Sequence, residues 1–328
     1  MEYALRAPPG DGVSSLAFSP IRGSLDLVVG SWDATVRLYD AGANSNKLTC
    51  MLSGACLSCC FGPDGTVAYA GGLDQGVYAL DLLRGGSKTV IGGHSKPISC
   101  MQYSLSSKML FTGGWDSAVH GWDERSSGAA VSLQGGQGIG GKVFSLSTEG
   151  TLVVVATSSK QILIYDTRNP AQPLQVRESP LRNQIRRVAL APGGGDLFVL
   201  ASTEARVAVE YIDDQDPSTQ KRNYAFKCHR SGNMAYPINA VVFHPIHRSS
   251  FATGGSDGVV NIWDAVMKKR ICQLPGYSNS ISSLAFSADG SRLAVAASYI
   301  FDEGQPRTDR EDNILIRELA PEEVTLNK

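Results

Sequence analysis

The sequence has no long apolar run. Its 328 residues contain no stretch of about eighteen or more uncharged apolar residues, the length that a helix needs to cross a bilayer. The N-terminus also lacks the basic start and following apolar segment of a secretory signal. We therefore expect a soluble, intracellular protein that does not bind membranes.

An excess of charge of either sign is absent as well. The chain carries 30 lysines and arginines against 31 aspartates and glutamates, which gives a net charge of −1. This balance excludes a broad basic surface that would bind DNA or an anionic membrane directly. Any site for an anion must be a local cluster of cations.

Catalytic and ligand-binding signatures are missing too. There is no serine-elbow motif, no pair of histidines at helical spacing and no phosphate-binding loop. Residues 136–141 match Gly-x-Gly-x-x-Gly, but a strand is expected after them, so we interpret them as a connecting loop. The seven cysteines are an odd set, and Cys56-x-x-Cys59 has no second pair to complete a zinc site. We predict no enzymatic activity, no catalytic residues, no cofactor and no metal.

What the sequence does contain is a short pattern that recurs. A turn aspartate is followed seven residues later by a second aspartate, with an apolar-rich strand between them. The turn aspartates of the clearest copies are Asp33, Asp74, Asp116 and Asp257. The closing aspartates at 40, 81, 123 and 166 lie 41 to 43 residues apart, a period typical of WD-repeat propeller blades. An aspartate suits the turn because its carboxylate can accept hydrogen bonds from nearby backbone amides.

Weaker copies complete a ring. Residues 158–166 and 203–211 keep the spacing, and a last copy begins at residue 280 and ends within residues 312–319. These copies predict an all-β fold, a seven-bladed WD-repeat β-propeller formed by residues 1–319. Tyr3, Ala4 and Leu5 are expected to add the outer strand of the last blade and so close the ring. Residues 320–328 are predicted to be a flexible tail, and the closed ring is expected to be monomeric by itself.

Histidine and tryptophan positions divide into structural and surface predictions. His94 is placed to bond the turn aspartate Asp116, with Trp122 packing nearby, which is a structural role. Trp32 and Trp115 stand directly before turn aspartates, where most blades have smaller residues. We expect these two indoles on one face of the disc as anchors for a bound segment, because aromatic residues are enriched at interfaces.

Basic residues gather in the region expected to form blades five and six. They are Arg182, Arg186, Arg187, Arg206, Lys221, Arg222, Lys227 and Arg230. Arg206 stands where other blades have small or uncharged residues, and Lys227 and His229 alternate with apolar residues in a predicted strand over 224–230. One interpretation is a solvated edge neutralised by Asp213, Asp214 and Asp216. The other is a site for an anionic peptide or a phosphate, which arginine can bind through two parallel hydrogen bonds.

The chain resembles a known family through several of these segments. They are Gly30-Ser31-Trp32-Asp33, Arg206-Val207-Ala208-Val209-Glu210-Tyr211, Phe226-Lys227-Cys228-His229-Arg230 and the repeat over 251–264. Together they look like the spindle-checkpoint WD-repeat adaptors, the family of the third "budding uninhibited by benzimidazole" protein. The resemblance covers about residues 10 to 319. The WD-repeat mRNA-export adaptors of the nuclear pore share the same segments and give the alternative function.

The resemblance implies a non-catalytic scaffold with two binding sites. On the face bearing Trp32, family members bind a short glutamate-containing segment of a checkpoint kinase or of its kinase-like relative. Arg186 would pair with a glutamate there, and we expect Trp115, His229 and Arg230 to contribute. Arg206 and Lys227 match the basic residues that bind phosphothreonine in Met-Glu-Leu-Thr repeats of an outer-kinetochore scaffold. The checkpoint complex that inhibits a ubiquitin ligase is a further implied partner.

The resemblance also implies a location and shows one departure. Family members are expected in the nucleus and at mitotic kinetochores, and also in the cytoplasm. This chain has Pro180-Leu181-Arg182-Asn183 where the family usually has Ser-Leu-Lys-Tyr. The aromatic residue beside the glutamate-binding arginine is therefore missing.

Overall fold

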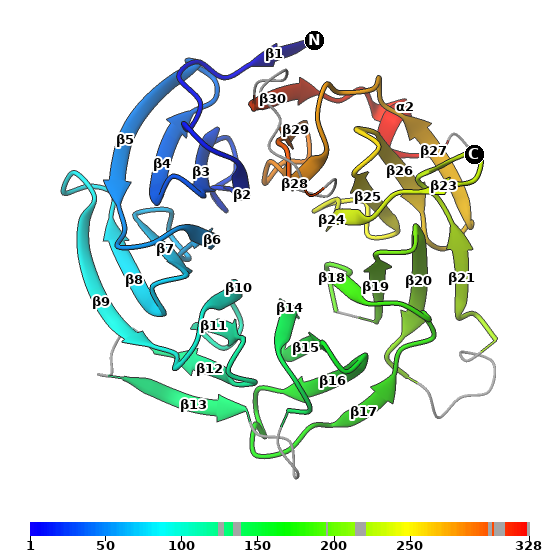
Figure 1. Cartoon of the computed structure of the whole chain (residues 1–328), viewed down its shortest axis with the longest axis horizontal. Helices are drawn as coiled ribbons and strands as arrows, with labels where there is room; N and C mark the ends of the chain where they lie inside the picture. Colours follow the sequence, from blue (N-terminus) through cyan, green and yellow to red (C-terminus); the bar gives the residue numbers. More distant parts are fainter. Residues whose placement is uncertain are drawn as a thin grey trace.

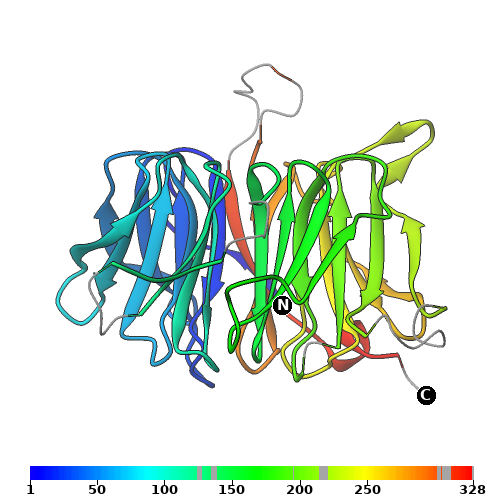
Figure 2. The same cartoon turned by 90° about the horizontal axis from the view of Figure 1, so that it is seen from below.

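The computed structural model describes residues 1–123, 128–133, 139–194, 196–213, 221–300, 304 and 312–326. These residues form seven four-stranded antiparallel sheets arranged as blades in a ring (Figure 1), and the innermost strands line a central channel. Seen from the side, the blades make a disc with connecting loops on both faces (Figure 2). The predicted seven-bladed propeller is confirmed.

Each blade runs outward from the channel. Blade one consists of β2 (Val13–Phe18), β3 (Asp26–Ser31), β4 (Thr35–Asp40) and β5 (Ser45–Met51). Blade two consists of β6 (Cys56–Phe61), β7 (Val67–Gly72), β8 (Gly76–Asp81) and β9 (Ser87–Gly93). Blade three consists of β10 (Ile98–Ser104), β11 (Met109–Gly114), β12 (Val119–Trp122) and β13 (Ala129–Leu133). Blade four consists of β14 (Val143–Glu149), β15 (Leu152–Thr157), β16 (Gln161–Asp166) and β17 (Gln175–Glu178). Blade five consists of β18 (Ile185–Leu190), β19 (Leu197–Ser202), β20 (Arg206–Tyr211) and β21 (Tyr224–Lys227). Blade six consists of β24 (Ile238–Phe243), β25 (Ser250–Gly255), β26 (Val260–Asp264) and β27 (Lys269–Gln273). Between blades five and six, β22 (Arg230–Ser231) and β23 (Met234–Ala235) form a small hairpin that rises from one face of the disc (Figure 2).

The last blade joins the two ends of the chain. It consists of β28 (Ile281–Phe286), β29 (Arg292–Ala297), β30 (Asn313–Glu318) and, as its outer strand, β1 (Glu2–Ala4). Tyr3 lies opposite Ile316, and the backbone amide of Leu5 donates to Ile314 at 2.8 Å. The predicted ring closure by the N-terminal strand is therefore present, and it removes a free sheet edge.

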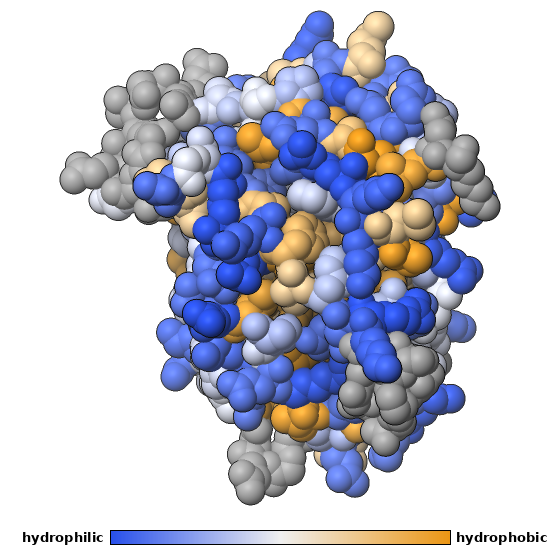
Figure 3. All heavy atoms as spheres, turned by 90° about the vertical axis from the view of Figure 1, so that its right-hand side faces the viewer, coloured by the Kyte–Doolittle hydropathy of each residue, from blue (hydrophilic) through white to orange (hydrophobic). Residues whose placement is uncertain are grey.

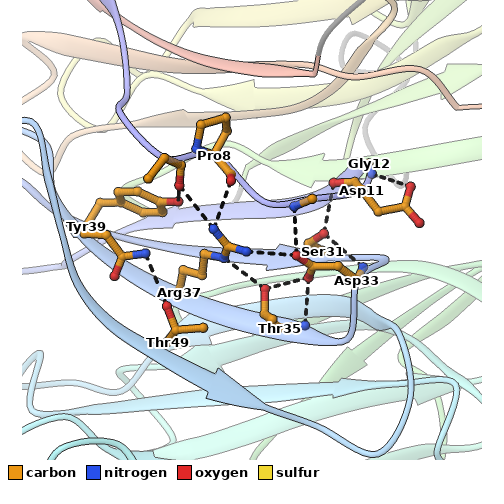
Figure 4. Close-up of polar contacts among 12 residues, drawn as sticks. Pro8, Asp11, Gly12, Ser31, Asp33, Thr35, Arg37, Tyr39 and Thr49 are labelled. Atoms are coloured by element: carbon orange, nitrogen blue, oxygen red, sulfur yellow. Dashed lines mark hydrogen bonds and ion pairs between the residues drawn. The ribbon is translucent and has the colours of Figure 1, made fainter. Parts of the chain in front are cut away.

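A cluster around Arg37 ties the segment after β1 to blade one (Figure 4). One guanidinium nitrogen of Arg37 donates to the carbonyls of Ala7 and Pro8, and another donates to Asp33 at 3.0 Å. The Tyr39 hydroxyl also donates to the Ala7 carbonyl, at 2.7 Å. The turn aspartate of the first blade thus helps to hold the closing segment through Arg37.

The core lies in the junctions between neighbouring blades. The buried apolar residues separate into seven clusters, and each cluster combines side chains from two adjacent blades. Tyr39 and Ile314, for example, meet where blade seven packs on blade one. Strands buried on both faces explain why the sequence shows only partial alternation of apolar and polar residues.

The C-terminal segment differs from the expected flexible tail. Pro321–Val324 form the short helix α2, which contacts β26 and β27, and Val324 is 5% exposed. The hydroxyl of Ser250 donates to the Val324 carbonyl at 2.6 Å. The last strand β30 ends at Glu318, and the segment after it buries an apolar side chain against blade six. Residues 327–328 lie outside the described residues.

Residues 136–138 of the loop that matches Gly-x-Gly-x-x-Gly lie outside the described residues, and so do most of the residues between β29 and β30. Among the described residues, no helix has the length and apolar character of a transmembrane span.

Candidate functional site

A ring of bulged residues surrounds the mouth of the central channel. In each of the seven innermost strands the pairing register shifts by one residue near the start of the strand, so one residue is left unpaired. These residues, which we call the mouth ring, are Ser14, Leu57, Ser99, Phe144, Arg186, Asn239 and Ser282. All seven line one cavity of about 660 Å³. Arg186 is the only charged member of the ring.

Aromatic residues form part of the same cavity. Trp32 is 48% exposed, Trp115 is half-buried, and both line it. The ammonium group of Lys142 lies 5.3 Å from the centre of the Trp115 ring. Phe144 and Tyr299 also line the cavity, and sequence reasoning missed both. The structure therefore gathers Trp32, Trp115 and Arg186 around one cavity, which Arg187 also lines.

Arg206 and Lys227 form a second feature, on the outer strands of blade five. They lie directly opposite each other in the pairing of β20 with β21, so their side chains leave the sheet on the same side. Lys227 is exposed, and the side chain of Arg206 is 35% exposed. We call these two residues the cation pair. The preceding turn includes Thr203, which lines the mouth cavity, so the cation pair lies on the same face of the disc as the mouth, on the two outer strands of blade five.

The cation pair is only partly neutralised. The Arg206 Nε lies 3.8 Å from the Glu204 carboxylate and has no hydrogen-bond partner among the described residues. The same carboxylate accepts the backbone amide of Arg182 at 3.2 Å, and Arg230 donates to the Glu204 backbone carbonyl at 2.8 Å. Of the acidic residues expected to neutralise this edge, Asp214 and Asp216 lie outside the described residues. Glu204 is instead the acidic residue that lies beside Arg206.

His229 does not belong to the binding surface, contrary to our prediction. Its side chain is fully buried, with Nδ1 at 2.9 Å from Asp257 and Nε2 at 2.8 Å from the Thr253 hydroxyl. The strand β21 ends at Lys227, and His229 has a positive φ of 50°, which breaks the alternation on which the prediction depended. His229 is a structural residue that fixes the chain between Lys227 and the exposed Arg230.

The turn aspartates make the bonds that their position suggests. Asp116 accepts from the ring of His94 at 3.1 Å and from two backbone amides, while Thr112 joins His94 to Trp122. Burial raises the pKa of Asp116, but the hydrogen bonds from His94 and the backbone outweigh burial, and the net pKa is lowered. Asp33 bonds Thr35 and Arg37, and Asp74 bonds the Tyr78 hydroxyl at 2.7 Å.

His94, Asp116 and His120 form a group of side chains that could hold a metal ion. One donor atom from each lies within 4.8 Å of the others. However, both ring nitrogens of His94 already face hydrogen-bond partners, Asp116 and Thr112. A metal ion would have to break this network, so the donor set fits a structural hydrogen-bond cluster better than a metal centre.

Comparison with known proteins adds the family. Residues 27–215 match the family model described as "Nucleolar protein 10-like, N-terminal domain", and residues 3–40, 220–264 and 268–299 match "WD domain, G-beta repeat". The chain is 42% identical to the mitotic checkpoint protein BUB3.1 of Arabidopsis thaliana, covering 98% of this chain and 93% of the relative. It is 39% identical to the mitotic checkpoint protein bub-3 of Caenorhabditis elegans, covering 98% and 95%. It is 32% identical to the mRNA export factor GLE2 of Chaetomium thermophilum, covering 92% and 85%.

Proposed function

Because the chain belongs to the Bub3 family of WD-repeat β-propellers, we propose that it is a non-catalytic adaptor of the spindle assembly checkpoint. In this proposal it binds checkpoint proteins through the mouth cavity and a phosphorylated kinetochore scaffold through the cation pair. The observation that carries the proposal is the placement of Arg206 and Lys227 directly opposite each other on the outer strands of blade five.

The mouth cavity suits an extended segment with a carboxylate. Trp32 and Trp115 offer large apolar contacts, and Arg186 is the one cation in the mouth ring. A glutamate of a checkpoint kinase, or of its kinase-like relative, would pair with Arg186. Replacing that glutamate by glutamine in a synthetic segment should weaken binding to the wild type and leave binding to Arg186→Ala almost unchanged.

The cation pair suits a phosphothreonine. A phosphate carries close to two negative charges and three acceptor oxygens, so two converging cations can make binding depend on phosphorylation. Arg206 offers a planar group for two parallel bonds, and Lys227 offers a mobile ammonium. The recruiting step would thereby be switched by a kinase that modifies Met-Glu-Leu-Thr repeats.

The test compares Met-Glu-Leu-Thr peptides with and without the phosphate. Hydrogen bonds to charged groups contribute about 1.5–3 kcal/mol each, so Arg206→Ala and Lys227→Ala should each weaken binding of the phosphopeptide about 10- to 100-fold. Lys269→Ala is the matched control, because Lys269 is an exposed lysine on the outer strand of the next blade. Equal affinity of the wild type for both peptide forms would refute this part of the proposal.

The proposal has consequences for partners and location. The protein should be found in the nucleus and at unattached kinetochores in mitosis, and in the checkpoint complex that inhibits a ubiquitin ligase. Affinity purification from mitotic cells, followed by identification of the co-purifying chains, would test these expectations together.

The alternative function is that of an mRNA-export adaptor. The relative described as an mRNA export factor covers 92% of this chain at 32% identity, below the identity of the checkpoint relatives. Recovery of a nuclear-pore protein in the same purification, with localisation at the nuclear rim in interphase, would favour this alternative.

A further inference from the structure

A second ring of residues lies inside the channel, one position after the mouth ring. Its members, which we call the channel ring, are Ser15, Ser58, Cys100, Ser145, Arg187, Ala240 and Ser283. All seven line a cavity of about 380 Å³ beneath the mouth. Six of them are small, and Arg187 is the only charged member. Arg187 also lines the mouth cavity, so it stands between the two spaces.

The small residues of this ring connect one blade to the next. The hydroxyl of Ser145 accepts the backbone amide of Val188 at 3.1 Å, and the hydroxyl of Ser283 accepts that of Leu16 at 3.1 Å. The serines at 15 and 58 accept equivalent amides. Arg187 connects its blade to the next in another way, because its Nε donates to the Asn239 carbonyl at 2.9 Å. The structural role of Arg187 therefore uses only one of its three nitrogens.

The remaining donors of Arg187 have no partner in the described part of the chain. No described residue accepts a hydrogen bond from either terminal nitrogen of Arg187, and no described carboxylate forms an ion pair with it. Burial lowers the pKa of Arg187, opposed only by the Cys100 thiol, yet a guanidinium stays protonated in proteins. The two carboxylates that line these cavities accept hydrogen bonds from backbone amides instead. Asp11 accepts the amide of Gly12, and Glu149 accepts that of Gly193.

We infer that Arg187 is the cation of an oxyanion site inside the channel. A phosphate, sulfate or carboxylate group would accept hydrogen bonds from its two terminal nitrogens in a forked geometry. Ser145 supplies a second donor, because its hydroxyl oxygen accepts the Val188 amide and its own proton has no acceptor among the described residues. A bound anion would neutralise this half-buried charge, so it would stabilise the folded protein.

The oxyanion has two possible sources. It is either a free ion or an acidic side chain that descends from a segment lying across the mouth ring. The second source rests on the proposed function, whereas the first does not. The experiment therefore has two arms.

The first arm uses inorganic phosphate and sulfate at constant ionic strength, with chloride as the balancing ion. In the wild type the unfolding temperature should rise with phosphate and saturate. Arg187→Ser introduces the commonest residue of the channel ring, so the variant should fold. Its apparent affinity for phosphate should be at least tenfold weaker than that of the wild type. Arg84→Ser is the matched control and should respond as the wild type does, because Arg84 is an exposed arginine outside both cavities.

The second arm measures binding of a glutamate-containing checkpoint segment to the wild type and to Arg187→Ser, with each glutamate changed in turn to glutamine. If changing one glutamate to glutamine weakens binding to the wild type but does not weaken binding to Arg187→Ser further, that glutamate is the anion that Arg187 binds. Equal responses of the wild type and Arg187→Ser in both arms would overturn the inference. A failure of the segment to bind at all would count against the proposed function and leave the first arm intact.

Discussion

Acid should destabilise this propeller through His244. This side chain is 2% exposed, and its Nδ1 accepts the backbone amides of Ile246 and His247 at 3.2 and 3.0 Å. Its Nε2 therefore carries the proton and donates to the Gly290 carbonyl at 3.1 Å. A second proton on Nδ1 would point at two N–H groups. Burial, together with the nearby His247, lowers the pKa of His244 to about 4.

The sign and size of the effect follow from this pKa. An unfolded histidine titrates near 6.5, so between pH 6.5 and 4 the unfolded chain binds more protons at this position than the folded one. The contribution of His244 to the free energy of unfolding is therefore fully present above pH 6.5, and it is lost as the pH falls towards 4. At about 1.4 kcal/mol per pKa unit, roughly 3 kcal/mol is lost by pH 4 and about 2 kcal/mol by pH 5.

The assay is urea unfolding of the wild type and of His244→Asn between pH 7.5 and 4.5. The asparagine oxygen can accept the same two amides without titrating, so the variant should start about 1–3 kcal/mol less stable at pH 7 and lose less on acidification. His247→Asn is the matched control and should keep most of the wild-type slope. If the wild type and His244→Asn lose stability in parallel as the pH falls, the assignment of the acid sensitivity to His244 is refuted.

Three further changes give separate tests. Glu204→Gln should free Arg206 and tighten phosphopeptide binding up to about fivefold, since half-exposed ion pairs contribute at most about 1 kcal/mol; calorimetry showing weaker binding would contradict this. Asp257→Ala leaves the buried His229 Nδ1 without its acceptor and should cost about 1–3 kcal/mol in urea unfolding, whereas an unchanged midpoint would argue against the network. Leu5→Ala should cost about 2–5 kcal/mol, because Leu5 is 3% exposed in the closing junction, and a smaller loss would mean that the junction relaxes.

The repeat made the blades predictable, because turn chemistry and strand spacing are local properties. The structural roles of the turn aspartates and of His94 could be predicted, because their hydrogen bonds reach only to the next turn. His229 could have been recognised in the same way, since it precedes Asp257 much as His94 precedes Asp116. It was misassigned because its positive φ cannot be seen in an alternating pattern of side chains.

Two other features were beyond a count of apolar positions. The mouth ring depends on a bulge in every inner strand, and a bulge shifts which side chains face the channel without changing the composition. The helix at residues 321–324 had a usable signal, a proline at its start followed by Glu322 and Glu323, which favour a helix N-terminus. Its burial against blade six is a tertiary contact that the local sequence does not encode.

The pairing of β1 with β30 also bears on how the protein is made. Glu2 and Arg317 lie 315 positions apart, yet they face each other in one sheet. During translation the first strand leaves the ribosome long before its partner exists, so six blades can form while the seventh still lacks its last two strands. Completion of the disc is thus a late step that joins β1 to β30, and a nascent chain that stalls before residue 313 keeps an open edge.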